Sequence, residues 1–296
     1  MAMHTWFECK IRYEKVMENG MNKKVTEPYL VDALSFTEAE ARIIEEMTPF
    51  ISLGNISKTF YGVKALDNMA LTLIPGEVHC LAGQNGCGKS TLIKIISGVY
   101  QPDANAEIII DGKQYTNLSP IDSVKAGVQV IYQDLSLFPN LTVAENIGIN
   151  QYHHHMLVNK REIRRIAELT IKSIDAKLDL DATVESLPIA QRQIVAICRA
   201  LSQEAKLIIM DEPTASLTMQ EVKGLLRVVH DLKKQNICVV FVSHRLDEVM
   251  EISDRITVLK DGKLVGTYPA SEIDNKKLAF LMTGKEFSYA VLPPIT

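Results

Sequence analysis

Short apolar runs alternate with amphipathic stretches from residue 51 onward. Three of these runs have the length and apolar character of buried strands: 76–83, 206–210 and 237–244. Two longer stretches repeat apolar residues with the helical period: 160–180 and 219–234. Asp-Gly pairs predict hairpins within two further segments: 107–113 and 256–268. The alternation predicts an α/β fold with a mainly parallel sheet and an antiparallel edge.

Residues 1–50 follow a different pattern. Apolar and charged side chains alternate from residue 7 to 13, which predicts a half-buried strand. Asn19-Gly20 is typical of a hairpin turn, and a second strand is expected over about 24–34. A helix capped by Ser35 or Thr37, the latter at capping-box spacing from Glu40, would then continue to Met47. The segment is therefore expected to form strand, turn, strand and helix.

Composition excludes several classes of protein. The 296 residues carry a net charge of −4, whereas a general nucleic-acid binder is usually basic. Five scattered cysteines without a CxxC pair favour a reduced, cytosolic protein over a disulfide framework. No apolar run approaches the roughly 20 residues of a membrane span, and the N-terminus shows no apolar signal core. Any membrane role is therefore expected to come through a partner.

A glycine-rich loop, GQNGCGKST at 83–91, lies between an expected strand and an expected helix and fits G-x-x-x-x-G-K-[ST]. Its glycines would let backbone amides approach a polyphosphate. Lys89 would reach the terminal phosphates, and the Ser90 hydroxyl would bind Mg²⁺. A glycine-rich structural turn is the alternative. The candidate nucleotide-binding residues in the loop are Gly83, Gln84, Asn85, Gly86, Cys87, Gly88, Lys89, Ser90 and Thr91.

A second cluster of candidate residues follows the apolar strands. In LIIMDEP at 207–213, Asp211 is expected to hold Mg²⁺ and Glu212 to act as general base toward water. His244 ends another strand and would contact the γ-phosphate, while Gln133 would ligate Mg²⁺ and sense that phosphate. A solvated turn and a structural histidine are the alternatives. The predicted catalytic residues are Lys89, Gln133, Glu212 and His244, and the predicted metal ligands are Ser90, Gln133 and Asp211.

Together these motifs resemble the ATP-binding subunit of ABC transporters over about residues 51–288. The segments FYGVKALDNMAL, DEPTASLT and VSHRLDEV resemble the first ATPase half of the tandem subunits in sugar importers. The resemblance implies a P-loop NTPase fold with an antiparallel β subdomain and an α-helical subdomain at about 134–200. It also implies that Phe60 stacks on adenine, with Tyr61 as the alternative; a core aromatic at a strand edge is the competing interpretation.

The signature loop departs from the family pattern. The family has Leu-Ser-Gly-Gly-Gln, which grips the γ-phosphate bound to the opposite half. Here those places hold Leu187, Pro188, Ile189, Ala190 and Gln191. Proline lacks an N–H, and the two added side chains obstruct the approach of backbone to phosphate. This loop is expected to serve the opposite site poorly. A second departure is Thr218, which stands where the family usually has an aspartate in the D-loop.

The resemblance implies an ATP-binding and ATP-hydrolysing subunit that powers sugar import, with ATP and Mg²⁺ as cofactors. The implied partners are a second ATPase half, an integral membrane permease and, indirectly, an extracytoplasmic sugar-binding protein, with no nucleic acid. The implied location is the cytoplasmic face of the membrane, peripheral through the permease. A non-transport ABC ATPase acting on ribosomes or DNA and an isolated ATP-binding half with little turnover are the alternatives.

The two ends of the chain lie outside this resemblance. Residues 1–50 resemble the start of an unrelated bacterial domain of unknown function, so they are expected to be a fused leader or a regulatory extension. Residues 289–296 are typical of a linker stub.

Overall fold

The computed structural model describes residues 5–16, 22–33, 35, 37, 39, 48–149 and 159–285. The chain divides into two compact units, residues 1–49 and 50–296. In the first unit, β1 (Thr5–Val16) pairs antiparallel with β2 (Asn22–Ala33). The two predicted strands are thus confirmed. The turn predicted at Asn19-Gly20 lies outside the described residues, as does most of the helix predicted to end at Met47.

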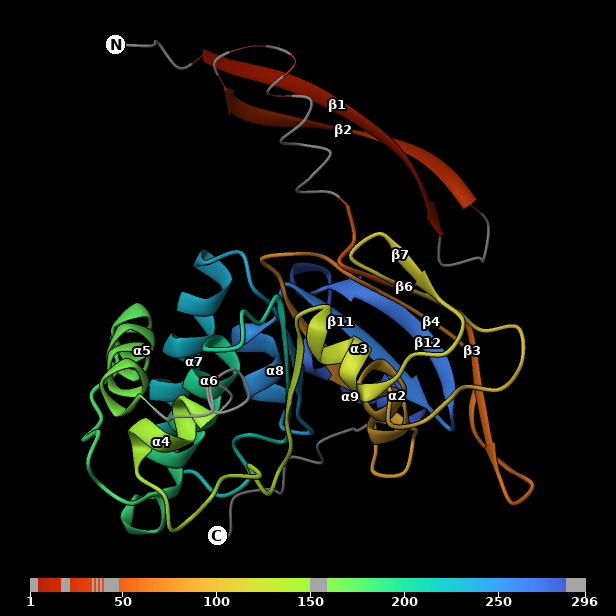
Figure 1. Ribbon diagram of the computed structural model, residues 1–296. Helices are drawn as coiled ribbons and strands as arrows, with labels where there is room; N and C mark the ends of the chain where they lie inside the picture. The colour runs from red at the N-terminus through yellow and green to blue at the C-terminus, as the bar shows by residue number, and fades with distance from the viewer. Residues whose placement is uncertain are drawn as a thin grey trace, which may run out of the picture. The chain divides into compact units, whose positions relative to one another are not determined.

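The second unit contains two sheets (Figure 1). The larger has the strand order β12-β11-β5-β10-β9-β8, in which only β12 runs antiparallel to its neighbour. The smaller is antiparallel, in the order β4-β3-β6-β7. The bounds are β3 Ile51–Phe60, β4 Val63–Leu73, β5 Val78–Ala82, β6 Glu107–Ile110, β7 Lys113–Tyr115, β8 Val128–Ile131, β9 Leu207–Asp211, β10 Cys238–Val242, β11 Arg255–Lys260 and β12 Lys263–Pro269. The predicted mainly parallel sheet and both predicted hairpins, β6-β7 and β11-β12, are confirmed.

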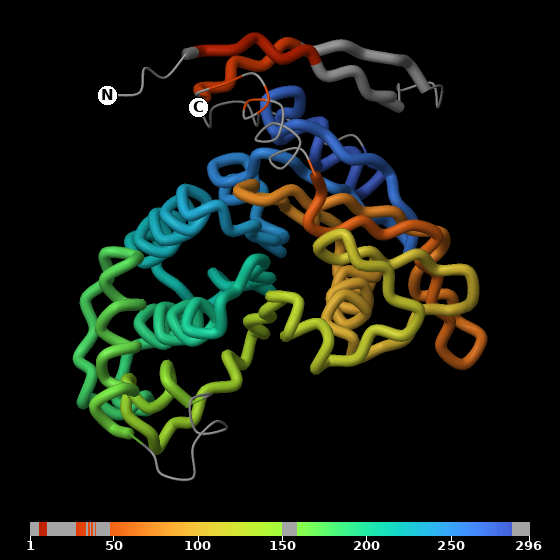
Figure 2. Tube along the Cα trace, turned by 45° about the horizontal axis from the view of Figure 1, so that its top comes forward, coloured from red at the N-terminus to blue at the C-terminus, as the bar shows by residue number. Residues whose placement is uncertain are grey.

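Helices cover both faces of the larger sheet. Their bounds are α2 Lys89–Ile96, α3 Pro120–Lys125, α4 Val143–Ile147, α5 Lys160–Ser173, α6 Ile189–Leu201, α7 Met219–Lys234, α8 Leu246–Ile252 and α9 Asn275–Thr283. Figure 2 shows α4 to α6, in green, on one side and α2 with the orange antiparallel strands on the other. One stretch predicted to be helical is shorter than expected. It was predicted over 160–180, but α5 ends at Ser173 because Asp175 adopts the left-handed region, with φ of 48°.

The core explains why the central strands are apolar at nearly every position. On β10, Val239 and Phe241 face a cluster that includes α6 and α7. The alternating residues Val240 and Val242 face α2 and the antiparallel sheet. Strands buried on both faces lose the polar alternation of a half-exposed sheet. The same packing fixes the carboxyl ends of the parallel strands at one edge, where loops carry the candidate site residues.

Candidate functional site

The glycine-rich loop connects β5 to α2. At Gly88, with φ of 106°, a Cβ would lie 2.6 Å from Leu66 Cδ2 and 2.7 Å from the Ala65 carbonyl oxygen. At Gly83, a Cβ would lie 2.4 Å from the backbone oxygen of Leu259. At Gly86 a Cβ would meet no atom within 4 Å, but the φ of 81° is a backbone conformation that favours glycine. The loop therefore depends on glycine at these three positions.

The Lys89 side chain folds back into this loop. Its Nζ donates hydrogen bonds to the carbonyl oxygens of Gly83, at 2.8 Å, and of Gln84, at 3.0 Å. The side chain is buried, and the buried Cys87 thiol lies 3.9 Å from the same nitrogen. Cys87 thus fills space beneath the loop, as a small residue can. The carbonyl and thiol groups that Lys89 Nζ contacts are neutral, so a bound phosphate would add a directly bonded anionic partner.

The remaining loop residues differ in exposure. Gln84, Asn85, Gly86 and Ser90 are exposed and Thr91 is half-buried. An exposed amide-rich loop that opens a helix is the geometry that binds phosphate groups. The predicted loop residues therefore lie where a polyphosphate could reach them.

Strand register brings the other candidate residues to the same edge. Val242 on β10 pairs with Leu81 on β5 and with Asp211 on β9. Ile131 on β8 pairs with Met210, one residue before Asp211. The loop at 83–88, the Asp211–Glu212 pair, His244 and Gln133 consequently all follow neighbouring strand ends. Gln133 is exposed.

Glu212 and His244 are in direct contact. His244 Nδ1 lies 3.2 Å from Glu212 Oε1, and the Glu212 amide donates to the Val242 carbonyl at 3.0 Å. Glu212 also adopts the left-handed region, with φ of 49°, which is uncommon outside glycine. Both side chains remain partly exposed. A carboxylate held by an imidazole at a sheet edge can take a proton from an incoming water.

Nearby positive charges only partly balance the negative charge of Asp211. Burial raises its pKa above the ordinary aspartate value, the neighbouring Glu212 carboxylate adds to the rise, and Lys89 and Lys94 oppose it. A divalent cation would supply the missing positive charge. Among the described residues, no three His, Cys, Asp or Glu side chains cluster as a metal site. The residues present still fit Mg²⁺, because that ion is usually held by one or two carboxylates together with phosphates and waters.

Phe60 and Tyr61, the two candidates for stacking on adenine, differ in their surroundings. Phe60 is half-buried and packs edge-on against Tyr100, with ring centroids 5.2 Å apart. Lys58 Nζ lies over the Phe60 ring, 5.4 Å from its centroid. Tyr61, the alternative for adenine stacking, is fully exposed with φ of 48°. The structure therefore leaves both aromatic rings as candidates for base stacking.

The motifs found in the sequence match a known family. The ABC transporter family matches residues 66–215, which is half of the chain and spans the glycine-rich loop and the Asp211–Glu212 pair. The chain belongs to the ABC transporter family. A second family, a domain of unknown function, matches residues 5–67, so its match begins in β1 and continues past the first unit.

Curated relatives of this ABC protein include sugar-import proteins. A ribose import ATP-binding protein of Burkholderia cenocepacia is 40% identical over 249 residues, covering 82% of this chain and 48% of that protein. A putative ribose/galactose/methyl galactoside import ATP-binding protein of Agrobacterium fabrum is 44% identical over 241 residues, covering 81% and 48%. The ABC protein described here spans about half the length of the curated relatives it matches.

Solved structures support the same fold. An ATP-binding cassette of an ABC transporter, 25% identical, aligns with a TM-score of 0.71 over 80% of this chain and 96% of that one. A dimeric cassette bound to ADP and phosphate, 26% identical, aligns with a TM-score of 0.64 over 74% and 98%. The predicted P-loop ABC fold is confirmed, and family membership implies that the ABC protein binds ATP.

The signature loop of this ABC protein has no glycine. Pro188 is the N-cap of α6, and α6 begins at Ile189, which is exposed. Leu187 is buried beneath them. Thr218 caps α7 through a reciprocal capping box with Glu221. Both departures from the family pattern are therefore accommodated locally as helix starts.

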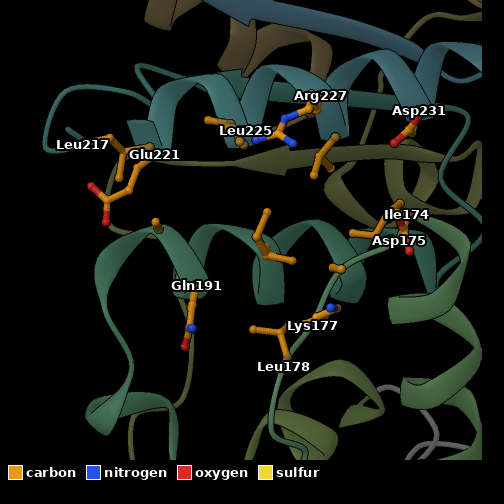
Figure 3. A pocket seen from close by; sticks show the side chains of 15 residues that line it. Ile174, Asp175, Lys177, Leu178, Gln191, Leu217, Glu221, Leu225, Arg227 and Asp231 are labelled. Carbon is orange, nitrogen blue, oxygen red and sulfur yellow. The ribbon is translucent and has the colours of Figure 1, made fainter. Parts of the chain in front are cut away.

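A cavity of about 330 Å³ lies beside this loop (Figure 3). Ala190, Gln191 and Ile194 line it from α6, and Leu225 and Val228 line it from α7. Its remaining walls come from 174–178, from Leu217 and from other residues of α7 rather than from the loop at 83–91. The candidate nucleotide-binding residues therefore do not line this cavity but follow the strand ends at the sheet edge.

Sequence reasoning missed three polar side chains around the site, of which Glu248 and Gln193 are buried and Arg199 is half-buried. Glu248 on α8 accepts hydrogen bonds from Thr214 and Ser243, which flank the candidate catalytic residues. Gln193 and Arg199 on α6 reach the carbonyls of Pro213 and of the loop after Gln133. The only available signal was a polar residue on the buried face of an amphipathic helix, which does not by itself identify its partner.

Proposed function

We propose that this chain is an ATP-binding and ATP-hydrolysing subunit that powers import of a sugar through a membrane ABC transporter. The observation that carries the proposal is the meeting of the phosphate-type loop and the Glu212–His244 pair at one sheet edge. The sugar-import names of relatives at 40% and 44% identity support the substrate class.

The residues would divide the chemistry as follows. Lys89 leaves its carbonyl partners to bind the β- and γ-phosphates, and the loop amides hold the remaining oxygens. Ser90, Gln133 and Asp211 would hold Mg²⁺, which neutralises charge that develops on the transferred phosphoryl group. Glu212 takes a proton from the attacking water, and His244 orients that carboxylate and contacts the γ-phosphate. Phe60 stacks on the adenine.

The chain would require a second ATPase half to complete its site. The nucleotide loop lies on an open sheet edge, and a solved dimeric cassette of the same fold is bound to ADP and phosphate. A second copy of this chain would present Pro188, Ile189 and Ala190 to the nucleotide. Each lost hydrogen bond to a charged phosphate oxygen costs about 1.5–3 kcal/mol. We therefore expect weak ATPase activity from the chain by itself.

The transport role would come through a permease. Among the described residues, no helix combines the length and apolarity needed to cross a bilayer. The segment after Gln133 exposes Phe138, with Leu137 half-buried beside it, and this apolar stretch suits a helix of an integral membrane permease. The chain would then lie peripherally at the cytoplasmic face, with an extracytoplasmic sugar-binding protein acting on the far side.

Ligand-dependent thermal unfolding tests the nucleotide site. Mg²⁺-ATP is expected to raise the midpoint of the chain, because a ligand that binds only the folded state stabilises it. Lys89→Ala is expected to abolish this rise, whereas the control Lys223→Ala, on exposed α7 surface, should preserve it. An equal rise in the wild type and Lys89→Ala would refute the proposed site. A permease and a sugar-binding protein encoded beside this chain would be expected for the transport role.

A further inference from the structure

Glu248 lies beneath the candidate catalytic pair and contacts both loops that carry it. One of its carboxylate oxygens, Oε2, accepts a hydrogen bond from Thr214 Oγ1 at 2.5 Å and another from Ser243 Oγ at 3.2 Å. Thr214 follows Glu212 by two residues, and Ser243 directly precedes His244. A single buried oxygen atom therefore joins the two loops below the contact between Glu212 and His244.

The bridge is shielded from solvent. Glu248 is 5% exposed, and Thr214 and Ser243 are each 2% exposed. The second carboxylate oxygen of Glu248 lies 2.6 Å from Arg245 Nη1, so the charge has a cationic partner. The Arg245 amide also donates to Ser243 Oγ at 3.1 Å. Hydrogen bonds to a buried, ionised carboxylate are short and strong, and such bonds hold neighbouring groups in fixed positions.

The catalytic contact above it has little other support. The Glu212 amide bonds the Val242 carbonyl, but the side chains of Glu212 and His244 are 23% and 53% exposed. Glu212 has an uncommon left-handed φ, so its loop needs fixed neighbours to keep that conformation. Gln193 Nε2 also donates to the Pro213 carbonyl at 3.0 Å on the Glu212 loop, whereas Glu248 contacts both loops through the two hydroxyls.

We propose that Glu248 is a positioning residue that sets the approach of His244 to Glu212 by holding Thr214 and Ser243 on one oxygen. This inference rests on the proposed function for its catalytic meaning, but the contact that it describes can be measured separately from ATP binding and hydrolysis. Loss of Glu248 would let the two loops separate, while the Lys89 loop, which Glu248 does not contact, would keep its affinity for phosphate.

The tautomer of His244 reports the contact directly. With Glu212 as acceptor, the neutral imidazole carries its proton on Nδ1, whereas an imidazole without that acceptor in water favours Nε2. Long-range ¹H–¹⁵N NMR at a fixed alkaline pH distinguishes the two forms, and His244→Gln identifies the signal. We expect the Nδ1–H form in the wild type and a shift toward the Nε2–H form in Glu248→Ala.

Two further variants keep the test decisive. Thr214→Val removes one bridging hydroxyl at nearly constant volume and is expected to shift the His244 tautomer in the same direction. It serves as the test if Glu248→Ala fails to fold. Glu251→Ala, an exposed carboxylate on the same helix, should leave the tautomer unchanged. Wild-type tautomer in folded Glu248→Ala or Thr214→Val would overturn the inference. Failure to bind Mg²⁺-ATP in the wild type would instead refute the proposed function and leave this result standing.

Discussion

His244 Nδ1 lies 3.2 Å from Glu212 Oε1, across the ends of two neighbouring parallel strands. The two residues are 32 positions apart in the chain, and the pairing of Val242 with Asp211 brings them together. A carboxylate in this position can accept a proton from water while the imidazole fixes its orientation. The contact therefore places the proposed hydrolytic chemistry on Glu212.

Replacing Glu212 should separate hydrolysis from binding. Glu212→Gln keeps the size of the side chain but removes its basicity, so the rate of phosphate release should fall about 10²-fold or more. The affinity for Mg²⁺-ATP should remain within about twofold, because Lys89 and its loop are intact. Single-turnover hydrolysis and equilibrium binding measure the two effects, with Glu251→Gln as the control. Equal losses of binding and hydrolysis would argue against a general-base role.

Two glycines of the nucleotide loop should respond differently to alanine. Both have positive φ, which strains a residue with a side chain by about 1–2 kcal/mol. At Gly88 the new Cβ would also meet Leu66 and the Ala65 carbonyl, whereas at Gly86 it meets no atom within 4 Å. Overpacking adds about 1–3 kcal/mol, so Gly88→Ala should lower the free energy of unfolding by more than Gly86→Ala. Denaturant unfolding measures both, and equal losses would contradict the packing.

Arg199 should stabilise the loop after Gln133. Its guanidinium donates to the carbonyls of Leu135, at 3.2 Å, and Ser136, at 2.8 Å, and both of those residues have positive φ. Burial lowers the pKa of Arg199 below its ordinary value. Arg199→Met should reduce the free energy of unfolding by about 1.5–3 kcal/mol, because it removes hydrogen bonds made by a charged donor.

A matched control isolates the role of Arg199. Arg227 is exposed, and its side chain donates a hydrogen bond to the Lys223 carbonyl within its own helix. Arg227→Met should therefore change the free energy of unfolding by no more than about 0.5 kcal/mol. Similar losses in the two variants would show that the bonds from Arg199 contribute nothing specific.

The buried His79 should make stability depend on pH. Its Nε2 lies 2.7 Å from Thr257 Oγ1, and its Nδ1 lies 3.2 Å from Glu77 Oε1. Burial lowers the pKa of His79 below the ordinary value of 6.5, and the Glu77 carboxylate only partly opposes this. Below about pH 6.5 the unfolded chain takes up a proton that the folded chain refuses, so stability should fall as pH decreases.

Glu77, in the same network, adds a pH dependence of its own only at lower pH. Burial acts to raise the pKa of Glu77, but His79 and Arg255 outweigh it and leave the pKa below 4.5, so the contribution of Glu77 is lost only under that pH. Between about pH 6.5 and 4.5, His79→Gln should remove up to about 1.4 kcal/mol of stability change per pH unit. His230 is exposed, so the control His230→Gln should leave the change of stability with pH as it is in the wild type. An unchanged slope in His79→Gln would contradict the buried neutral imidazole.

The parts of the site that the sequence predicted are those formed by local chain geometry. The loop at 83–91 is specified by its own glycines, and the apolar runs before Gln133, Asp211 and His244 predict that all of them end at one sheet edge. The contacts of Glu248, Gln193 and Arg199 could not be predicted. Each joins segments far apart in the chain, and helical periodicity identifies a buried position without naming the carbonyl or hydroxyl that it meets.

The length of α5 shows a second limit. Apolar residues continue with helical spacing after Ser173, but Asp175 turns the chain out of the helix and the following residues line the cavity beside α6. Spacing alone does not distinguish a helix from a loop that packs its apolar residues against the same core.

We propose that this chain holds a complete nucleotide cradle and an impaired signature loop. The most direct measurement compares the ATPase rate per chain, over a range of concentrations, between the wild type and the triple variant Pro188→Ser/Ile189→Gly/Ala190→Gly. We expect weak turnover for the wild type. For the variant we expect a rate that rises with concentration and is abolished by adding Glu212→Gln. Rapid, concentration-independent turnover by the wild type, or no gain in the variant, would contradict it.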